Sequence, residues 1–511
     1  MKQTKISAGV FILLLLMVGM ACSLTSPTPA SWSRTPTAEA QAATNAAIAL
    51  TQQVALEQTG RLRTPTPDFT EEKTFTPTYE PTNEIDGPWL VYPGGEGGML
   101  YAYDLEAYQT IEISLPEPIY TADLVRGLSP DGETLIIRAG SPLNLDELAL
   151  YQIDLPSAEI IQISPLLSLT LQRKIVNAVG SRAFETLQAV TRAEGLAWSP
   201  NGRYLAFTGA LDNQSSDLYI YDTMNDRVER LNGLYSQNGV PYWSPGSNFL
   251  ISLEFGEFDQ EDGSWHALNV TGIQVPGFND QNTLYFPDSE SQGEVFVGWL
   301  NSQTFISYSL TPSGLETLRQ VNIEKEEVTV IFRGSFDEVG FDPYTKTIAF
   351  IVGNNNSAPN EMVAGIYLLK PGSTAYNLQR AGDWESCVWD SGGMFVVSQS
   401  QGVLLIHPDG GDVFLADEGG VNLSPTGNWM VGWGDGVKGA VGARLYQSSS
   451  SRPLQELSDI AIKNVFWQPD SKGFFLFGEE ALYHLEFPAL NPQKIREGFS
   501  KDDLIDFIWV E

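Results

Sequence analysis

One short pattern recurs along most of this chain: an apolar or aromatic residue, a tight turn, and then a run of β-forming residues. In its fullest copy, Trp198 precedes the turn Ser-Pro-Asn-Gly and an alternating apolar run follows. Turn residues between alternating apolar runs predict short strands joined by tight turns. We call the residue before the turn the marker. The other markers are Leu128, Trp243, Trp299, Phe341, Trp389, Leu423, Trp467 and, at the end of the chain, Trp509.

The spacing of the markers determines the fold class. After a first gap of 70 residues, successive markers lie 34 to 56 residues apart. A repeat of about 40–50 residues with four short strands is typical of a β-propeller, an all-β ring of blades. The markers, together with one blade shared by the two ends of the domain, favour nine blades over eight. Eight stays open, because the irregular gaps of 56 and 34 residues can hide a misassigned repeat. We therefore predict an all-β propeller of eight to nine four-stranded blades at 87–511.

The two ends of the predicted propeller complement each other. The range 89–115 supplies three strands but lacks the first strand that the other repeats have, whereas 504–511 (LIDFIWVE) is a first strand with nothing after it. We predict that this last strand pairs into the first blade and closes the ring. Closure removes exposed strand edges, so we expect the loss of 504–511 to destabilise the whole domain.

The best-preserved repeats point to a family. WSPNG at 198–202 followed by LYIYD at 218–222, and LSPDG at 128–132 followed by LYQID at 150–154, resemble the repeat of TolB-type, WD-repeat-like β-propellers. The resemblance covers roughly 87–511 and implies the fold. It implies no single function, since such propellers serve as binding modules, peptidase accessory domains and enzymes. TolB proteins carry a small α/β domain before the propeller, and this chain has a Thr- and Pro-rich segment there, which argues against a TolB-like role.

The range 1–21 has the pattern of a secretory signal: Lys2 and Lys5 precede an apolar run, ISAGVFILLLLMVGM. That run is short for a membrane span. Gly-Met-Ala before Cys22 resembles a lipobox, which implies that Cys22 becomes a lipidated first residue. Ordinary signal cleavage and an uncleaved anchor remain alternatives. We predict a lipoprotein anchored to the membrane through Cys22.

The range 22–86 is rich in Thr, Pro, Ala and Ser and lacks the apolar density of a folded domain, so we predict a disordered tether. Within it, 37–59 has high helix propensity. A partly helical spacer is favoured there over a coiled-coil or docking helix. In the first long gap between markers, 165–192 has apolar residues at helical spacing and predicts one or two inserted helices. Packing over the ring is favoured for this insert over a lid or partner surface.

The chain is strongly acidic, with 29 Lys and Arg against 63 Asp and Glu and a net charge of −34. Such a chain repels nucleic acid phosphates and anionic lipid headgroups, so we expect neither as a direct partner. A solvated surface suited to an external medium explains the charge without any ligand.

Catalytic candidates are few. The three histidines, His266, His407 and His484, lie in or beside predicted strands, where structural roles are more common, and no pair has metal-ligand spacing. No Gly-x-Ser-x-Gly nucleophile motif occurs. The acidic loops at 212–217 and 257–263 contain oxygen ligands that calcium accepts, but neither has EF-hand spacing, and solvated loops are favoured. We predict no catalytic, cofactor or metal site.

The tryptophans and Cys387 remain to be placed. The repeated marker tryptophans are expected to fill the gaps between blades. Trp265 and Trp433 fall outside that register and are the better candidates for an aromatic binding surface. Cys387 adjoins the marker Trp389 and is expected to be buried.

We therefore expect a monomeric, extracytoplasmic lipoprotein that is not an enzyme and needs no cofactor. A ring face or the central channel would bind or scaffold a protein, peptide or glycan. The alternatives are a propeller enzyme that acts on extracellular polysaccharide or peptide, and a structural subunit of a surface assembly.

Overall fold

The computed structural model describes residues 88–510 except 95–98, 145, 156, 178–180, 213–214, 232–236, 256–264, 273–292, 311–315, 354–361, 374, 400–401, 417, 435–441, 460, 480 and 500–505. The expected signal segment, Cys22 and the helix expected at 37–59 lie outside the described residues. Among the described residues, no helix is long and apolar enough to cross a membrane.

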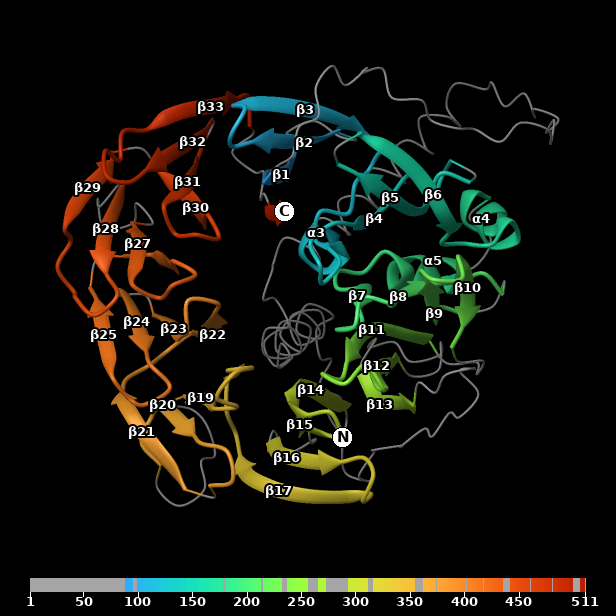
Figure 1. Ribbon diagram of the computed structural model, residues 1–511. Helices are drawn as coiled ribbons and strands as arrows, with labels where there is room; N and C mark the ends of the chain where they lie inside the picture. Colours follow the sequence, from blue (N-terminus) through green and yellow to red (C-terminus); the bar gives the residue numbers. More distant parts are fainter. Residues whose placement is uncertain are drawn as a thin grey trace, which may run out of the picture.

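The described strands form nine antiparallel sheets that follow one another around a ring (Figure 1). Seven sheets have four strands and two have three. The predicted propeller of eight to nine blades is confirmed.

We number the sheets in chain order around the ring. Sheets 1 to 3 contain β34 (Ile508–Val510), β1 (Trp89–Pro93), β2 (Met99–Asp104) and β3 (Gln109–Ser114); β4 (Leu135–Ala139), β5 (Ala149–Asp154) and β6 (Glu159–Pro165); and β7 (Leu196–Trp198), β8 (Tyr204–Gly209), β9 (Asp217–Asp222) and β10 (Arg227–Arg230). Sheets 4 to 6 contain β11 (Gln237–Trp243), β12 (Phe249–Phe255) and β13 (Trp265–Gly272); β14 (Gly293–Asn301), β15 (Thr304–Leu310), β16 (Glu316–Asn322) and β17 (Glu327–Gly334); and β18 (Glu338–Phe341), β19 (Ile348–Val352), β20 (Gly365–Leu369) and β21 (Tyr376–Ala381). Sheets 7 to 9 contain β22 (Ser386–Asp390), β23 (Met394–Gln399), β24 (Gly402–Ile406) and β25 (Asp412–Leu415); β26 (Gly420–Leu423), β27 (Trp429–Trp433), β28 (Ala443–Gln447) and β29 (Gln455–Ser458); and β30 (Ile462–Trp467), β31 (Gly473–Gly478), β32 (Ala481–Glu486) and β33 (Gln493–Glu497).

The last strand closes the ring, as the sequence predicts. β34 pairs antiparallel with β1, with Trp89 opposite Val510 and Val91 opposite Ile508. Ile508 and Val510 are buried in one hydrophobic cluster with strands of sheets 1 and 2. The two ends of the domain therefore form a single sheet.

The recurring turn has a common physical basis. In sheet 3, the hydroxyl of Ser199 accepts a hydrogen bond from the backbone N–H of Tyr204 at 2.9 Å. Serines at the same place do so in three other repeats, and each bond spans five residues; these pairs are Ser129 with Thr134, Ser244 with Phe249, and Ser424 with Trp429. The serine thus satisfies a backbone donor at the start of the next strand.

The marker tryptophans join neighbouring sheets. Four of the six donate an indole N–H to a backbone carbonyl of the preceding sheet or its inner flank. The pairs are Trp198 to Gly127 at 2.8 Å, Trp243 to Ala197 at 2.9 Å, Trp467 to Asn422 at 3.2 Å and Trp509 to Trp467 at 2.7 Å. The indole nitrogens of Trp299 and Trp389, in contrast, are buried without a partner among the described residues. The rings also pack in clusters shared between adjacent sheets. These tryptophans therefore belong to the core, and their regular recurrence has a structural cause.

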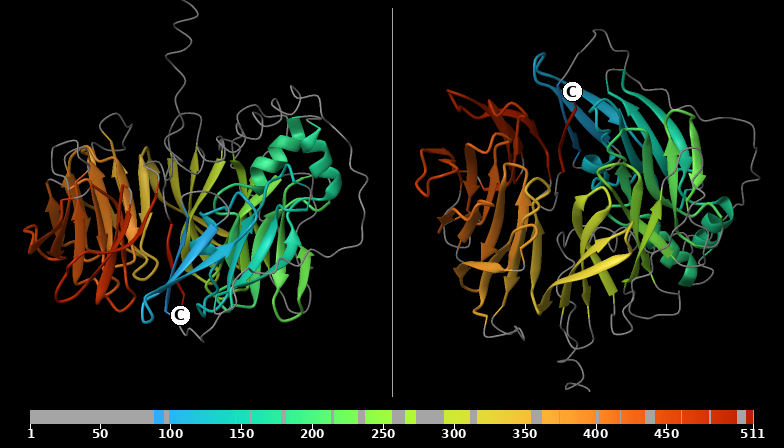
Figure 2. Two further views of the ribbon diagram at one scale, coloured as in Figure 1. Left: turned by 90° about the horizontal axis from the view of Figure 1, so that it is seen from above. Right: turned by 60° about the horizontal axis from the view of Figure 1, so that its bottom comes forward.

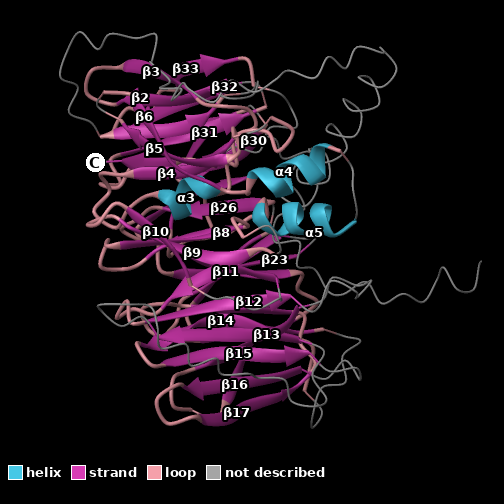
Figure 3. Cartoon of the chain, turned by 90° about the vertical axis from the view of Figure 1, so that its right-hand side faces the viewer, coloured by secondary structure: helices cyan, strands magenta, loops and turns pink. Residues whose placement is uncertain are grey.

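Three helices interrupt the repeats in the described part of the chain. The short α3 (Asp123–Gly127) precedes Leu128, which bridges Leu135 at the place of the missing innermost strand of sheet 2. Two helices, α4 (Leu169–Val176) and α5 (Ser181–Val190), lie within 165–192 and stand out beyond the strands on one face of the ring (Figure 2). Figure 3 shows that this face is the one away from the C-terminus.

Candidate binding site at the inner rim

Among the described elements, α3 and the first strands of the sheets lie nearest the centre of the ring, including β7, β22 and β30 (Figure 1). We call these elements the inner rim. Side chains here come from different sheets, so a cluster on the inner rim joins residues that lie far apart in the sequence. Such convergence is typical of binding sites on propellers and other closed β structures.

One cluster of charged and aromatic side chains spans four successive sheets; we call it the rim cluster. It comprises Arg126 of α3, Glu194 just before β7, Tyr242 of β11 and Phe296 of β14. Nη2 of Arg126 lies 3.4 Å from Oε1 of Glu194. The hydroxyl of Tyr242 donates to Oε2 of Glu194 at 3.4 Å. Glu194 therefore connects the guanidinium group with the phenol.

Aromatic contacts extend the cluster. The guanidinium carbon of Arg126 lies 5.5 Å from the centre of the Tyr242 ring. Phe296 stacks on the same ring with centroids 4.5 Å apart. Tyr242 follows an irregularity in the pairing of β11 with β12, where Val240 has a positive φ of 53°. A bulge of this kind redirects a side chain, which places Tyr242 between Arg126 and Phe296.

The charged groups of the rim cluster are partly open to solvent. The side chain of Arg126 is 27% exposed and that of Glu194 is 52% exposed. Burial, together with the nearby Glu194 carboxylate, raises the pKa of Tyr242 above its ordinary value. Tyr242 therefore stays a neutral hydrogen-bond donor, while Arg126 and Glu194 offer one charge of each sign.

A buried ion pair holds the rim cluster in place. The side chains of Arg138 of β4 and Asp123 of α3 are both fully buried, and Nη2 of Arg138 lies 2.6 Å from Oδ1 of Asp123. The same guanidinium donates to the carbonyl of Val190 at 2.5 Å and to that of Arg192 at 2.8 Å. Burial alone would lower the pKa of Arg138, but the Asp123 carboxylate outweighs it and raises the pKa. Arg138 thus fixes both α3 and the segment that leads to Glu194.

The rim cluster is suited to binding. Its ion-pair distance of 3.4 Å is longer than a close charge-assisted hydrogen bond, so a ligand carboxylate or hydroxyl can compete for Arg126. Glu194 can likewise accept from a ligand amine or hydroxyl. Arg126 lies over the Tyr242 ring and Phe296 stacks on it, so the ring already has two neighbours and the cluster mainly offers polar contacts.

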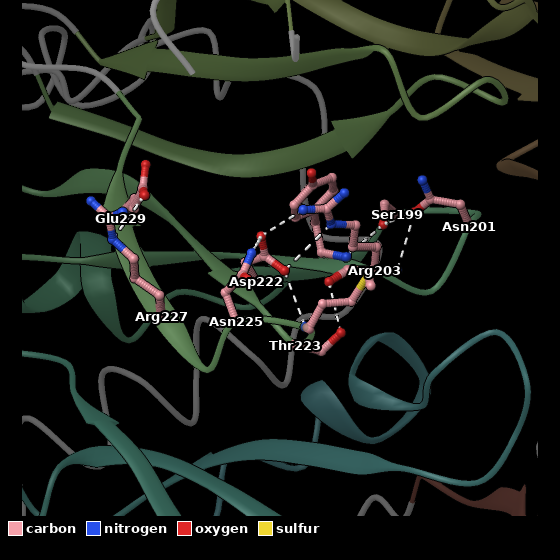
Figure 4. A network of polar contacts seen from close by, with 10 residues as sticks. Ser199, Asn201, Arg203, Asp222, Thr223, Asn225, Arg227 and Glu229 are labelled. Carbon is pink, nitrogen blue, oxygen red and sulfur yellow. Dashed lines mark hydrogen bonds and ion pairs between the residues drawn. The ribbon is translucent and has the colours of Figure 1, made fainter. Parts of the chain in front are cut away.

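A second polar network, shown in Figure 4, belongs to the fold. Nη2 of Arg203 lies 3.0 Å from Oδ2 of Asp222, which also accepts from the Asn225 amide at 2.8 Å. The hydroxyl of Thr223 donates to the backbone carbonyl of Arg203 at 2.9 Å. These residues connect the turn after Trp198 with the turn after β9, so the most family-like residues of the chain are explained by turn structure.

Of the two aromatic residues proposed from the sequence, Trp433 lies apart from the rim cluster. Trp433, at the end of β27, is partly buried and packs against the cluster between sheets 8 and 9. Its ring lies so close to Gly420 that a Cβ atom there would come within 2.5 Å of it. β27 and α3 lie on opposite sides of the ring (Figure 1). Trp265 begins β13, and its side chain, like Cys22, lies outside the described residues.

The other candidates have ordinary surroundings. His484 is buried, stacks on Phe475, and contacts the Gln468 amide at 2.9 Å. His407 is half exposed beside Asp409, and the side chain of His266 is outside the described part. Cys387 is fully buried, as expected. In the described part of the chain, no three His, Cys, Asp or Glu side chains are grouped as a metal site requires.

Sequence reasoning missed the rim cluster. Arg126 and Glu194 are 68 residues apart, and Tyr242 lies 48 residues further on. The available signal was the long gap between Leu128 and Trp198, because an insertion that departs from the repeat places additional residues beside the ring.

No family model matches the chain. One curated relative, described as the uncharacterized peptidase YuxL of Bacillus subtilis (strain 168), is 30% identical over 84 residues. The match covers 15% of this chain and only 13% of that protein. It is therefore a local likeness.

Solved structures share the fold. A eukaryotic initiation factor structure is 10% identical, with a TM-score of 0.52, and the match covers 82% of this chain and 98% of that one. TolB from Acinetobacter baumannii is 13% identical, with a TM-score of 0.29, over 60% of this chain and 68% of that one. At 10% identity the likeness to the initiation factor structure concerns the fold alone. The nine described sheets themselves confirm the β-propeller that the TolB-type resemblance implies.

Proposed function

We propose that this chain is a monomeric extracytoplasmic lipoprotein whose propeller binds a protein, peptide or glycan partner at the inner rim without catalysis. The observation that carries the proposal is the rim cluster. Groups from four sheets meet there, and a guanidinium and a carboxylate remain partly exposed. Paired, partly exposed charges beside rigid aromatic residues provide specificity for a polar partner.

The test of binding is a pull-down of the full chain from its native membrane after mild crosslinking, with recovered proteins and glycans identified by mass spectrometry. The Arg126→Ala variant should recover the partner about tenfold less than the unchanged chain, since central arginines often carry binding energy. Arg227→Ala is the matched control, because Arg227 is 70% exposed on the outer strand β10. Equal recovery with both variants would exclude the rim cluster as the binding site.

The anchor is tested separately. Cells grown with a clickable fatty acid should label the chain, and Cys22→Ser should abolish the label. A label that persists in Cys22→Ser would contradict the lipoprotein assignment. Mass measurement in detergent would test the monomer.

The alternative is a propeller enzyme that acts on extracellular peptide or polysaccharide. The local match to a protein described as a peptidase favours it. Purified chain would be incubated with peptide and polysaccharide libraries, and cleavage abolished by Glu194→Gln but retained in Arg227→Ala would replace the binding proposal with an enzymatic one.

A further inference from the structure

The two-helix insert has a charge opposite to that of the whole chain. The range 165–192 contains four basic residues and one acidic residue, a net charge of +3, in a chain of −34. The basic residues are Arg173, Lys174, Arg182 and Arg192, and the acidic one is Glu185. An anionic surface that is repelled by the rest of the chain can therefore approach here.

The solvent face of α4 combines apolar and basic residues. Leu171, Gln172 and Ile175 are buried against the ring. Leu169 and Val176 are each 37% exposed, and Arg173 and Lys174 are exposed as well. Residues 169, 173 and 176 lie along one stripe of the helix, because they are four and three positions apart. No acidic residue occurs on α4.

This face is rigidly held. The Ser168 side chain caps α4 by accepting from the Leu171 N–H at 3.3 Å. The buried amide of Gln172 donates to the Leu167 carbonyl at 3.1 Å and accepts from the Asp146 N–H at 3.0 Å. The helix therefore presents Leu169, Arg173, Lys174 and Val176 in a fixed arrangement.

The position of α4 leaves the face accessible to a flat surface. α4 and α5 protrude beyond the strands (Figure 2), on the side of the ring away from the C-terminus (Figure 3). A large planar partner that approached this side would meet the helices before it met the strands.

We propose that the α4 face, defined by Leu169, Arg173, Lys174 and Val176, contacts the anionic headgroups of the membrane to which the chain is attached. The inference rests on the proposed lipid anchor. A membrane interface accepts both kinds of side chain, because apolar residues enter the acyl boundary while lysine and arginine contact anionic lipid. Two basic residues give a weak contact, but a lipid anchor holds the chain at high effective concentration. The contact orients the ring with α4 toward the lipid and most of the acidic surface away from it.

The test uses the full chain with Asn177→Cys, which follows α4 and is exposed. An environment-sensitive fluorophore attached there reports contact with lipid. Cys387 does not compete for the label because it is fully buried, and Cys22 does not compete in the anchored chain because its thiol carries the lipid. The chain is reconstituted on vesicles of phosphatidylcholine alone or with phosphatidylglycerol. We expect a blue shift and quenching by brominated lipid with phosphatidylglycerol, and neither with phosphatidylcholine alone.

The charge-reversed variant Arg173→Glu/Lys174→Glu should lose both signals. Arg452→Glu/Lys472→Glu is the matched control, since it changes the net charge equally at exposed positions on sheets 8 and 9. The control should behave as the unchanged chain. Thermal unfolding of each variant checks that the fold is kept, because Arg173 and Lys174 lie in the last turn of α4, where basic side chains stabilise a helix.

Each outcome has a distinct meaning. Quenching that is equal with both lipids, absent with both, or unchanged in Arg173→Glu/Lys174→Glu overturns the proposal. If the label is shielded only when extracted membrane proteins are added, the α4 face binds an acidic protein, and the proposal is overturned as well. Flotation with phosphatidylcholine alone reports the anchor. A chain that instead floats only on vesicles with phosphatidylglycerol, and loses this in Arg173→Glu/Lys174→Glu, lacks the anchor but still makes the α4 contact.

Discussion

We call the contact between two neighbouring sheets a seam. Two seams of the ring both have a tryptophan as the marker, and yet the hydrogen bonding of the two indoles differs. Between sheets 8 and 9, the indole N–H of Trp467 donates to the Asn422 carbonyl at 3.2 Å. Between sheets 4 and 5, the indole nitrogen of Trp299 is buried without a hydrogen-bond partner among the described residues. The exposed fractions are similar, 5% for Trp467 and 8% for Trp299. The ring therefore fills the gap in both seams, and the hydrogen bond is an addition that only the first has.

The preceding inner strand differs between these two seams. The acceptors Gly127, Ala197 and Asn422 each lie one residue before a marker. For Trp299 the corresponding residue is Tyr242, which follows the irregularity in β11 and has its ring in the rim cluster. The residue that joins the rim cluster is thus the one whose carbonyl a regular seam would use.

In two other seams the marker is not a tryptophan, and a charged side chain makes the hydrogen bond between the sheets. Where Phe341 is the marker, Lys346 donates to the Trp299 carbonyl at 3.2 Å. Where Leu423 is the marker, its N–H donates to Oδ2 of Asp390 on β22 at 3.5 Å. In both seams, a hydrogen bond to or from a charged side chain thus takes the place of the indole hydrogen bond.

Removing the closing strand, β34, should reduce the free energy of unfolding more than any other change proposed here. A chain that lacks 504–511 loses the buried side chains of Ile508 and Val510 and the bond from Trp509 to the Trp467 carbonyl at 2.7 Å. Large-to-small changes in a core typically cost about 2–5 kcal/mol each, so we expect a loss of more than ~5 kcal/mol and reduced cooperativity. Calorimetry measures both. Unfolding identical to that of the full chain would exclude β34 as the strand that stabilises the ring.

The comparison between the two tryptophan seams is tested by Trp467→Phe and Trp299→Phe. Both substitutions remove a similar volume, but only the first leaves a carbonyl without its donor. We expect Trp467→Phe to destabilise the chain by about 1–2 kcal/mol more than Trp299→Phe. The reason is that the Asn422 carbonyl would be left buried without a hydrogen-bond donor, which carries a desolvation cost. Chemical denaturation gives both free energies. Equal losses would mean that the indole bond contributes nothing to a seam.

Lys346→Met tests whether the replacement bond matters. Methionine keeps much of the side chain's length but cannot donate to the Trp299 carbonyl. The expected loss is about 1 kcal/mol in the free energy of unfolding. Lys472→Met serves as the control, since Lys472 is 75% exposed. A loss no larger than that of the control would show that the seam holds by packing alone.

Asp390→Asn should give the smallest effect, and one that depends on pH. Burial raises the pKa of Asp390 above its ordinary value of 3.8, although the N–H groups of Gly392 and Leu423 lower it in part. Above pH 3.8 the unfolded chain releases this proton before the folded chain does, so the contribution of Asp390 to stability falls as pH rises toward the raised pKa. An asparagine side chain at this position cannot ionise, so the variant lacks this dependence.

The stability of Asp390→Asn relative to the unchanged chain should therefore improve as pH rises from 3.8, and then level off above the raised pKa. Thermal unfolding measured at a series of pH values checks this. A difference that is constant with pH would contradict the assigned burial of the carboxylate.

Local and periodic features explain why the fold could be predicted. Ser199 and its counterparts act over five residues, and the markers recur at similar spacing, so turns, strands and the closing strand 508–510 were accessible to sequence reasoning. The rim cluster was not, because Arg126 and Glu194 meet through a short helix and an insertion that follow no repeat. The choice of Trp433 illustrates the limit: departure from the register identified it, but its ring lies against Gly420.

The order in which the chain is made gives the pairing of β34 with β1 a further meaning. β1 is synthesised early, but its partner consists of residues 508–510, which leave the ribosome after all the other sheets of the ring have been made. A chain cut short before these residues keeps an unpaired edge on β1, which other strands can join and proteases can reach. Closing the ring therefore acts as a quality check: only a chain synthesised through residues 508–510 can cover the edge of β1.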